Sequence, residues 1–155
     1  MKTMQYWLMK SEPSVYSIDD LKRDRTTWWE GVRNYQARNF MQNEMKPGDV
    51  FLFYHSNADP SGVAGLGVVQ KAAQPDKTAQ DRKNPYFDPK STVDKPIWYC
   101  VGVQFKSIFP RLVSLEELKQ HPKLKKMMVT QRGSRLSIQP VQPEEFRIVC
   151  ELGGL

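Results

Sequence analysis

The chain has 155 residues, with 23 Lys and Arg against 17 Asp and Glu, a net charge of +6 and 39% hydrophobic residues. This length fits one domain spanning residues 1–155, and the composition excludes disordered, collagen-like and disulfide-scaffold proteins. No apolar window could cross a bilayer, and the N-terminus lacks the apolar region of a signal peptide. We therefore expect a monomer with no membrane partner, located in the cytoplasm, or in the nucleus if the source is eukaryotic.

Alternating apolar residues, capping residues and turn residues predict the elements of the first half of the chain. Ser17 followed by Asp20 is typical of a helix N-terminus, and the continuous apolar run at 50–54 is typical of a buried strand. In chain order we expect a strand at 4–10, a helix beginning after Ser17, a loop at 26–33, a helix at 34–45 and a strand at 50–54.

The second half contains a long polar connection at 73–95. It exceeds the roughly 12–15 residues usual for a loop without structure, which suggests a functional excursion. Around it we expect a turn at 59–62, a strand at 63–71, a strand at 97–109, a helix at 114–119 capped by Ser114, one or two turns at 123–128, a strand at 136–141 and a helix from Pro143 through Cys150.

These elements predict an α+β chain of five or six strands with helices inserted between them. Strands separated by turns and irregular helices do not have the regular βαβα alternation of a doubly wound parallel sheet. We therefore expect a small, mostly antiparallel β-barrel with helices around it.

Motifs for catalysis and cofactor binding are missing. The sequence contains no P-loop, no nucleophile elbow and no complete dinucleotide-binding fingerprint. Cys100 and Cys150 lie far apart without metal-ligand spacing, so we interpret them as core thiols. We expect no metal, no cofactor and no enzyme activity.

The segment 28–35 combines large rings with polar groups. At least one of Trp28 and Trp29 should cover the core, and the other could line a cleft where a planar ligand stacks. Two roles are open for Asn34: it can cap the following helix, or its amide can read the hydrogen-bonding edge of a base.

Two further segments offer hydrogen-bonding side chains. His55, Ser56 and Asn57 follow a buried strand, whose end would hold them rigidly, although Asn57 could instead form a turn with its own backbone. Arg135 could pair with a phosphate or with a surface carboxylate.

Positive charge is concentrated in the second half. Residues 76–155 carry 14 cations and 9 anions, and 119–135 contains cations but no acid. Such a stretch attracts polyanions, or it is a solvated helix face followed by a loop. The backbone-phosphate contacts we expect from it are Lys123, Lys125, Lys126 and Arg132.

Several ordered motifs along almost the whole chain resemble those of the EVE domain family. They are YWLMKSEP at 6–13, WEGVRNYQARNF at 29–40, GD at 48–49, YHSN at 54–57, GVAG at 62–65 and SRLSIQPV at 134–141. The resemblance implies a PUA-like β-barrel related to the YTH domains, which read N6-methyladenine in RNA. It also implies a pocket that takes up a modified base.

Carried over to this chain, the resemblance places ligand-binding residues at the ends of expected strands and around the tryptophan pair. They are Lys10, Ser11, Trp28, Trp29, Val32, Arg33, Asn34, Tyr35, His55, Ser56, Asn57, Ser134, Arg135, Leu136 and Ser137. We further expect Asn34 and Ser56 to approach one cleft together with a tryptophan ring.

The resulting expectation is a non-catalytic module that binds DNA or RNA carrying a modified base. The base would be extruded and held by stacking on tryptophan and by hydrogen bonds from Asn34, Ser56 and Asn57. Two alternatives are open. One is an enzyme or adaptor acting on a small nucleotide or modified nucleoside, with His55 as a proton-transfer group, and the other is an interaction module whose aromatic residues all belong to the core.

Overall fold

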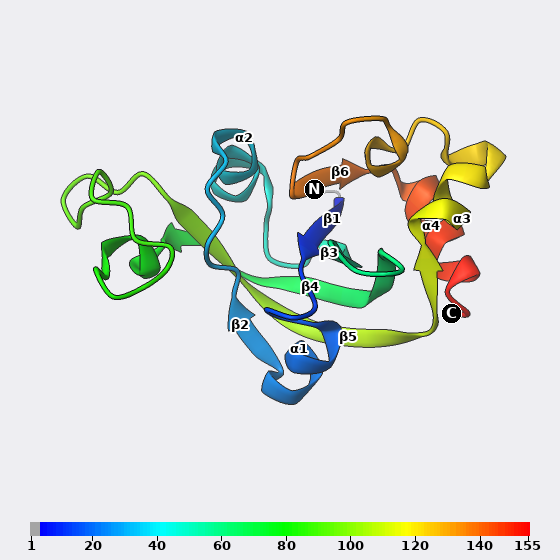
Figure 1. Cartoon of the computed structure of the whole chain (residues 1–155), viewed down its shortest axis with the longest axis horizontal. Coiled ribbons are helices and arrows are strands. Elements are labelled where there is room, and N and C mark those ends of the chain that lie inside the picture. The colour runs from blue at the N-terminus through cyan, green and yellow to red at the C-terminus, as the bar shows by residue number, and fades with distance from the viewer. Residues whose placement is uncertain (1–3) are drawn as a thin grey trace.

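The computed structural model describes residues 4–155 (Figure 1). Residues 1–3, which begin the N-terminal stretch compared above with a signal peptide, lie outside the described residues. The strands are β1 (Tyr6–Ser11), β2 (Thr26–Trp28), β3 (Val50–His55), β4 (Gly62–Pro75), β5 (Tyr99–Ser114) and β6 (Ile138–Val141). The α-helices are α1 (Ile18–Asp24), α2 (Tyr35–Asn39), α3 (Leu115–Gln120) and α4 (Pro143–Leu152). Shorter helical segments are η1 (Phe40–Glu44), η2 (Lys77–Gln80), η3 (Pro122–Leu124) and η4 (Met128–Thr130).

All six strands form one sheet in the order β2-β5-β4-β3-β1-β6. β1 runs parallel to β3, and every other neighbouring pair is antiparallel. The expected α+β class and the mostly antiparallel strands are therefore confirmed. Several register shifts interrupt the pairing of β4 with β5, and such irregularities bend a sheet. Figure 1 shows both strands sweeping across the molecule, with α3 and α4 at one end and the segment after β4 at the other.

The core lies on both faces of this sheet. Successive residues of a strand point to opposite faces, so Trp7 and Met9 join one apolar cluster while Leu8 joins a second. The same alternation in β3 places Phe51 and Phe53 with the first cluster. Burial on both faces explains why β3 reads as a continuous apolar run.

The predicted helix starts are confirmed, but several element boundaries are corrected. The strands expected at 63–71 and 97–109 run on to Pro75 and Ser114, so the connection expected at 73–95 begins later. Ser17 and Ser114 each form a capping box, because each hydroxyl accepts from a backbone N–H that is three residues further along the chain. The segment 26–33, expected as a loop, begins with the strand β2. The helix expected at 34–45 is α-helical only through Asn39 and then continues as a single π-helical turn. No helix within residues 4–155 combines the length and the apolar character that a membrane span needs.

Candidate functional site

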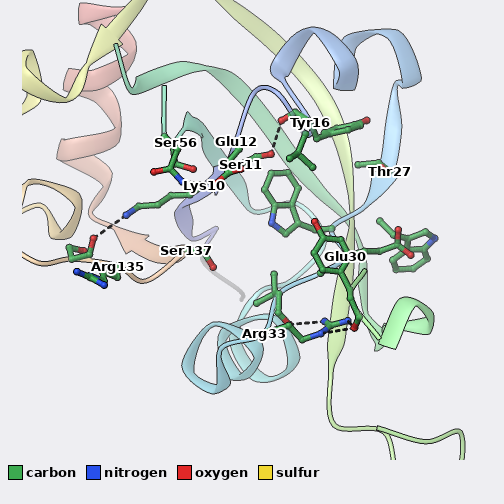
Figure 2. Close-up of a pocket in the computed structure, with 18 residues that line it drawn as sticks. Lys10, Ser11, Glu12, Tyr16, Thr27, Glu30, Arg33, Ser56, Arg135 and Ser137 are labelled. Atoms are coloured by element: carbon green, nitrogen blue, oxygen red, sulfur yellow. Dashed lines mark hydrogen bonds between the residues drawn. The ribbon is translucent and has the colours of Figure 1, made fainter. Parts of the chain in front are cut away.

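A cavity of about 920 Å³ lies where the ends of β1 and β3 face the segment that follows β2. This volume is within the usual range of small-molecule sites, roughly 300–1,000 Å³. Figure 2 shows Lys10, Arg135 and Ser137 on one side and Glu30 and Arg33 on the other. Of the fifteen ligand-binding residues expected from the sequence, the structure brings together Lys10, Ser11, Trp28, Trp29, Val32, Arg33, Ser56, Asn57, Ser134, Arg135 and Ser137 around this cavity.

The parallel pairing of β1 with β3 accounts for one wall. Parallel strands end at the same edge of a sheet, so Ser11 lies opposite His55, and the N–H of Ser56 donates to the carbonyl of Ser11 at 3.0 Å. On the other side of β1, the N–H of Lys10 donates to the carbonyl of Ser137 at 2.8 Å. This bond draws the segment before β6 to the same cavity.

The opposite wall comes from β2 and the residues after it. The N–H of Trp29 donates to the carbonyl of Val101 in β5 at 2.8 Å, which extends the pairing of β2 beyond Trp28. β2 and β6 are the two edges of the sheet. Residues of β2 and of the segment leading into β6 line one cavity, so the sheet curls toward a barrel. The cavity lies at the opening between the two edge strands.

The two tryptophans of this wall differ in burial. Trp29 is only 7% exposed, and its ring lies edge-on to Phe51 and Phe53 with centroids 5.6 and 5.4 Å away. Trp28 is half-buried, and the ammonium of Lys71 lies 5.6 Å from its ring centroid. The expectation that at least one of the pair covers the core is confirmed for Trp29.

The indole N–H groups separate this pair from the other two tryptophans. The indoles of Trp7 and Trp98 donate to the carboxylates of Asp49 and Asp88, at 3.0 and 2.7 Å. Within residues 4–155, by contrast, the indole N–H of Trp28 or Trp29 donates to no protein group. No buried side-chain nitrogen in this range lacks a partner, so the indole nitrogen of Trp29 is not fully sealed in the core. Within residues 4–155, both tryptophans therefore line the cavity with an indole N–H that no protein group accepts.

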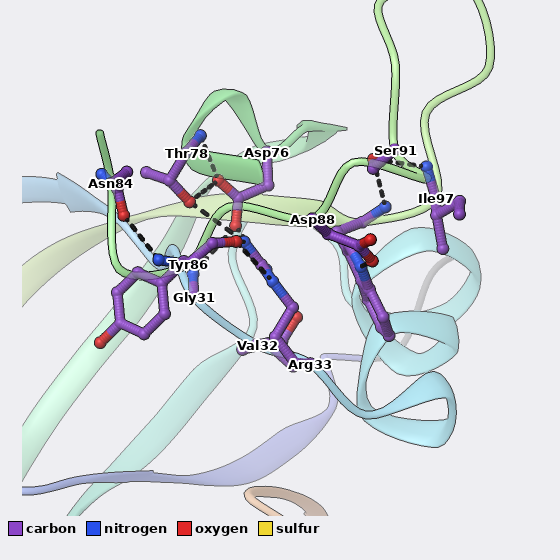
Figure 3. A network of polar contacts seen from close by, with 11 residues as sticks. Gly31, Val32, Arg33, Asp76, Thr78, Asn84, Tyr86, Asp88, Ser91 and Ile97 are labelled. Carbon is purple, nitrogen blue, oxygen red and sulfur yellow. Dashed lines mark hydrogen bonds and ion pairs between the residues drawn. The ribbon is translucent and has the colours of Figure 1, made fainter. Parts of the chain in front are cut away.

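A buried ion pair fixes the part of the wall that follows Trp29 (Figure 3). The guanidinium of Arg33 lies 3.1 Å from the carboxylate of Asp76, whose side chain is fully buried. That carboxylate also accepts from the N–H of Gly31 at 2.9 Å and from the hydroxyl of Thr78 at 2.6 Å. Burial alone would raise the pKa of Asp76, but these hydrogen bonds outweigh it and lower the pKa.

The same guanidinium ties the wall to the long connection. Arg33 donates to the carbonyl of Tyr86 at 2.6 Å, and the ring of Tyr86 lies against Gly31, whose φ is +85°. A side chain on Gly31 would meet that ring 2.7 Å from its Cβ. Arg33 is thus committed to the protein's own groups, and its role at the cavity is to hold the wall in place.

The structure places Asn34 and Tyr35 outside the residues that line the cavity. The side-chain oxygen of Asn34 accepts from the N–H of Ala37 at 2.9 Å, which is the capping role, so Asn34 and Ser56 do not share the cleft as expected. Tyr35 packs against Trp98 and the guanidinium of Arg38, with ring-centroid distances of 4.9 Å to each. Both residues secure α2.

His55 and Leu136 also lie outside the lining. The Nε2 of His55 accepts from the N–H of Ile18 at 3.2 Å, so the imidazole serves the first turn of α1. Burial lowers the pKa of His55, which keeps the ring neutral and able to accept. Leu136 packs against the apolar cluster that contains Trp29.

Two ionisable side chains of the cavity are perturbed by their surroundings. The ammonium of Lys10 donates to the carbonyl of Ser134 at 3.2 Å, and burial lowers its pKa. Burial, and then the charge of Asp76, raises the pKa of Glu30. Within residues 4–155, no protein group donates a hydrogen bond to the Glu30 carboxylate. A cation and an acceptor thus face one cavity from opposite walls.

Seven further residues line the cavity, and these were not among the expected ligand-binding residues: Glu12, Val15, Tyr16, Thr27, Glu30, Gly31 and Tyr86. Glu12, Glu30 and Gly31 lie inside the motifs shared with the EVE family, so those motifs carried a signal for them. For Tyr86 the signal was the unusual length of the connection at 73–95. Nothing local marks Thr27, because its place at the cavity follows from the pairing of β2 with β5.

The basic stretch divides between two places. Arg132 lines a second cavity beside the first, together with Lys10, Lys119 and Arg135. Lys123, Lys125 and Lys126, also expected to contact phosphates, line neither cavity. The separation arises because η3 and η4 turn the chain between Lys119 and Arg132.

Comparison with known proteins gives consistent results. The family model of the EVE domain matches residues 5–152. Human thymocyte nuclear protein 1 is 45% identical over 166 residues, covering 95% of this chain and 73% of that protein. A protein of Schizosaccharomyces pombe, described as uncharacterized, is 39% identical over 163 residues, covering 96% and 68%.

Solved structures superpose closely. A crystal structure of a Pseudomonas syringae protein matches with a TM-score of 0.92 at 45% identity, covering 96% of this chain and 99% of that one. The crystal structure of human THYN1 in complex with 5-methylcytosine-containing DNA matches with a TM-score of 0.89 at 44% identity, covering 97% and 98%. An ASCH protein of Zymomonas mobilis, at 10% identity and a TM-score of 0.56, shares the fold alone.

Proposed function

Because the chain belongs to the EVE domain family, we propose that it binds DNA carrying a modified base and holds that base in the cavity between β1, β3 and β2, without catalysing a reaction on it. Support for modified DNA comes from the human relative that was crystallised with DNA containing 5-methylcytosine. Support for the location comes from the chemistry of the cavity.

The observation that carries the proposal is the pair of unused indole N–H groups on Trp28 and Trp29. Rings at a cavity stack on a base, and each stacked base contributes about 1–3 kcal/mol by alanine substitution. A donor on the ring edge additionally meets an acceptor of the base, and a cytosine offers such acceptors at N3 and O2. Structural tryptophans of this protein behave differently, since Trp7 and Trp98 use their N–H groups on carboxylates.

The two walls complement a base with an exocyclic amine. Glu30 presents a carboxylate without a donor partner in residues 4–155, and carboxylates accept from the N4 amine of cytosine. Lys10 faces it as a cation, and the hydroxyls of Ser56 and Ser137 supply adaptable hydrogen bonds. A base inside a duplex cannot reach these groups, so the proposal requires it to leave the stack, at a cost of a few kcal/mol.

The position of His55 favours binding over catalysis. The enzyme alternative needs this imidazole as a proton-transfer group, and a general base must come within about 3 Å of the proton it removes. Its Nε2 instead accepts from the backbone of α1, and the residue does not line the cavity. We therefore keep the non-catalytic module as the proposal.

Titration of the protein with oligonucleotides of one sequence, containing either 5-methylcytosine or cytosine, tests this function. We expect tighter binding of the methylated strand, and we expect Glu30→Gln to weaken it because an acceptor becomes partly a donor. Glu44→Gln, which makes the same change at an exposed carboxylate of η1 outside the cavity, is the matched control. Equal affinity for both oligonucleotides, across single and double strands, would contradict the proposal.

A further inference from the structure

A second cavity, of about 670 Å³, adjoins the base cavity and shares Lys10, Ser134 and Arg135 with it. It lies between the end of α3 and the segment that follows η4. The two cavities therefore have one common wall, and Figure 2 shows Lys10 reaching along it toward Arg135.

The charge of this second cavity is of one sign. Lys10, Lys119, Arg132 and Arg135 line it, and no Asp or Glu does. Within residues 4–155, Lys119, Arg132 and Arg135 form no ion pair with an acid. By contrast, the base cavity contains two carboxylates, those of Glu12 and Glu30. The second cavity thus offers uncompensated positive charge, which suits an anion with several oxygens.

The segment that carries Arg132 and Arg135 is anchored on both sides. Before it, the hydroxyl of Thr130 donates to the carbonyl of Met127 at 2.7 Å. Within it, the hydroxyl of Ser134 accepts from the buried Gln139, which follows the segment, at 3.0 Å. The carbonyl of Ser134 accepts from Lys10. These bonds fix the backbone, so less ordering entropy is lost when a ligand binds.

We propose that this second cavity is the phosphate-binding groove for the strand whose base occupies the first cavity, with Lys119, Arg132 and Arg135 contacting the adjacent phosphates. The inference rests on the proposed function, because it needs a base in the first cavity to place the strand. The common wall at Lys10 and Arg135 is where sugar and phosphate pass from one cavity to the other. The cations expected from the sequence at Lys123, Lys125 and Lys126 lie off this path.

The test compares two variants that each remove two positive charges from the same basic stretch. Lys119→Gln with Arg132→Gln removes the two cations of the groove that do not line the base cavity. Lys123→Gln with Lys126→Gln is the matched control. All four side chains are exposed, so both variants should melt at the temperature of the wild type. The probes are single-stranded oligonucleotides with and without 5-methylcytosine, titrated across a series of salt concentrations.

Each phosphate contact contributes about 0.7 to the slope of log affinity against log salt for a single strand. Losing two contacts should flatten the slope by about 1.4 and weaken binding by about 25-fold at 0.1 M salt. The control should keep the wild-type slope, and the groove variant should keep the preference for the methylated strand. Equal slopes in the two variants would overturn the groove. A flattened slope without any preference for 5-methylcytosine in the wild type would sink the base-reading function while supporting the groove.

Discussion

The buried carboxylate of Asp76 should be among the most sensitive positions for stability. It accepts from Gly31, Arg33 and Thr78 at distances between 2.6 and 3.1 Å, and its side chain is fully buried. Removing one partner of a buried ion pair costs about 3–5 kcal/mol, because the other charge is left without compensation. Asp76→Ala should therefore lower the free energy of unfolding by about 3–5 kcal/mol, out of the roughly 5–15 kcal/mol that typical domains have.

Urea unfolding measures this loss. With a slope near 2 kcal/mol per molar urea, the midpoint should fall by about 2 M. Asp88→Ala is the control, since its half-buried carboxylate accepts only from the indole of Trp98 among side chains and should lose less. A double-mutant cycle with Arg33→Ala should give a coupling of at least ~1 kcal/mol between residues in contact.

The acid limb of the stability curve provides a second readout for Asp76. Its pKa in the folded protein lies below the ordinary value of 3.8, so its contribution is complete above that value and is lost as pH falls through the lower folded pKa. The variant should lack this loss. If Asp76→Ala cost less than about 1 kcal/mol, as an ordinary hydrogen bond does, the view that this ion pair holds the cavity wall would be refuted.

Two further predictions follow from the site. Trp29→Ala should lower the free energy of unfolding by about 3–5 kcal/mol. Trp28→Ala should keep the fold and lose about 1–3 kcal/mol of oligonucleotide binding free energy. If thermal melts and titrations showed the reverse, Trp28 would be the core residue and Trp29 the base-stacking residue. Because the pKa of His55 is lowered by folding, the unfolded chain binds a proton more readily than the folded one. The contribution of neutral His55 to the free energy of unfolding is therefore full above pH ~6.5 and is lost as pH falls from that value toward the folded pKa. Unfolding measured between about pH 7 and 5 should show this loss in the wild type and not in His55→Gln, and an unchanged profile would exclude the role of His55 at α1.

Local signals predicted much of the fold. The capping boxes of Ser17 and Ser114 require a hydroxyl followed by an acid three residues later, and the sequence shows both. The strand β2 was missed because three residues are too few to show alternation, and its partner β5 lies far along the chain. Its pairing is a tertiary effect that no local pattern displays.

Part of the candidate site could also be predicted. Motifs at the ends of β1 and β3 pointed to Ser11 and Ser56, because strand ends place side chains rigidly. Asn34 shows the limit of such reasoning, since capping a helix and reading a base call for the same side chain and only the fold separates them. The groove cations could not be chosen from the sequence, because η3 and η4 decide which of them face the cavity.

The four indole N–H resonances of the protein allow the most direct test of base reading. Labelled protein would be titrated with matched oligonucleotides that differ only in 5-methylcytosine, and the indole signals followed by NMR. The cavity account predicts that the signals of Trp28 and Trp29 move, more for the methylated strand, while those of Trp7 and Trp98 stay in place because carboxylates hold them. Binding that left the Trp28 and Trp29 signals unmoved would contradict the account.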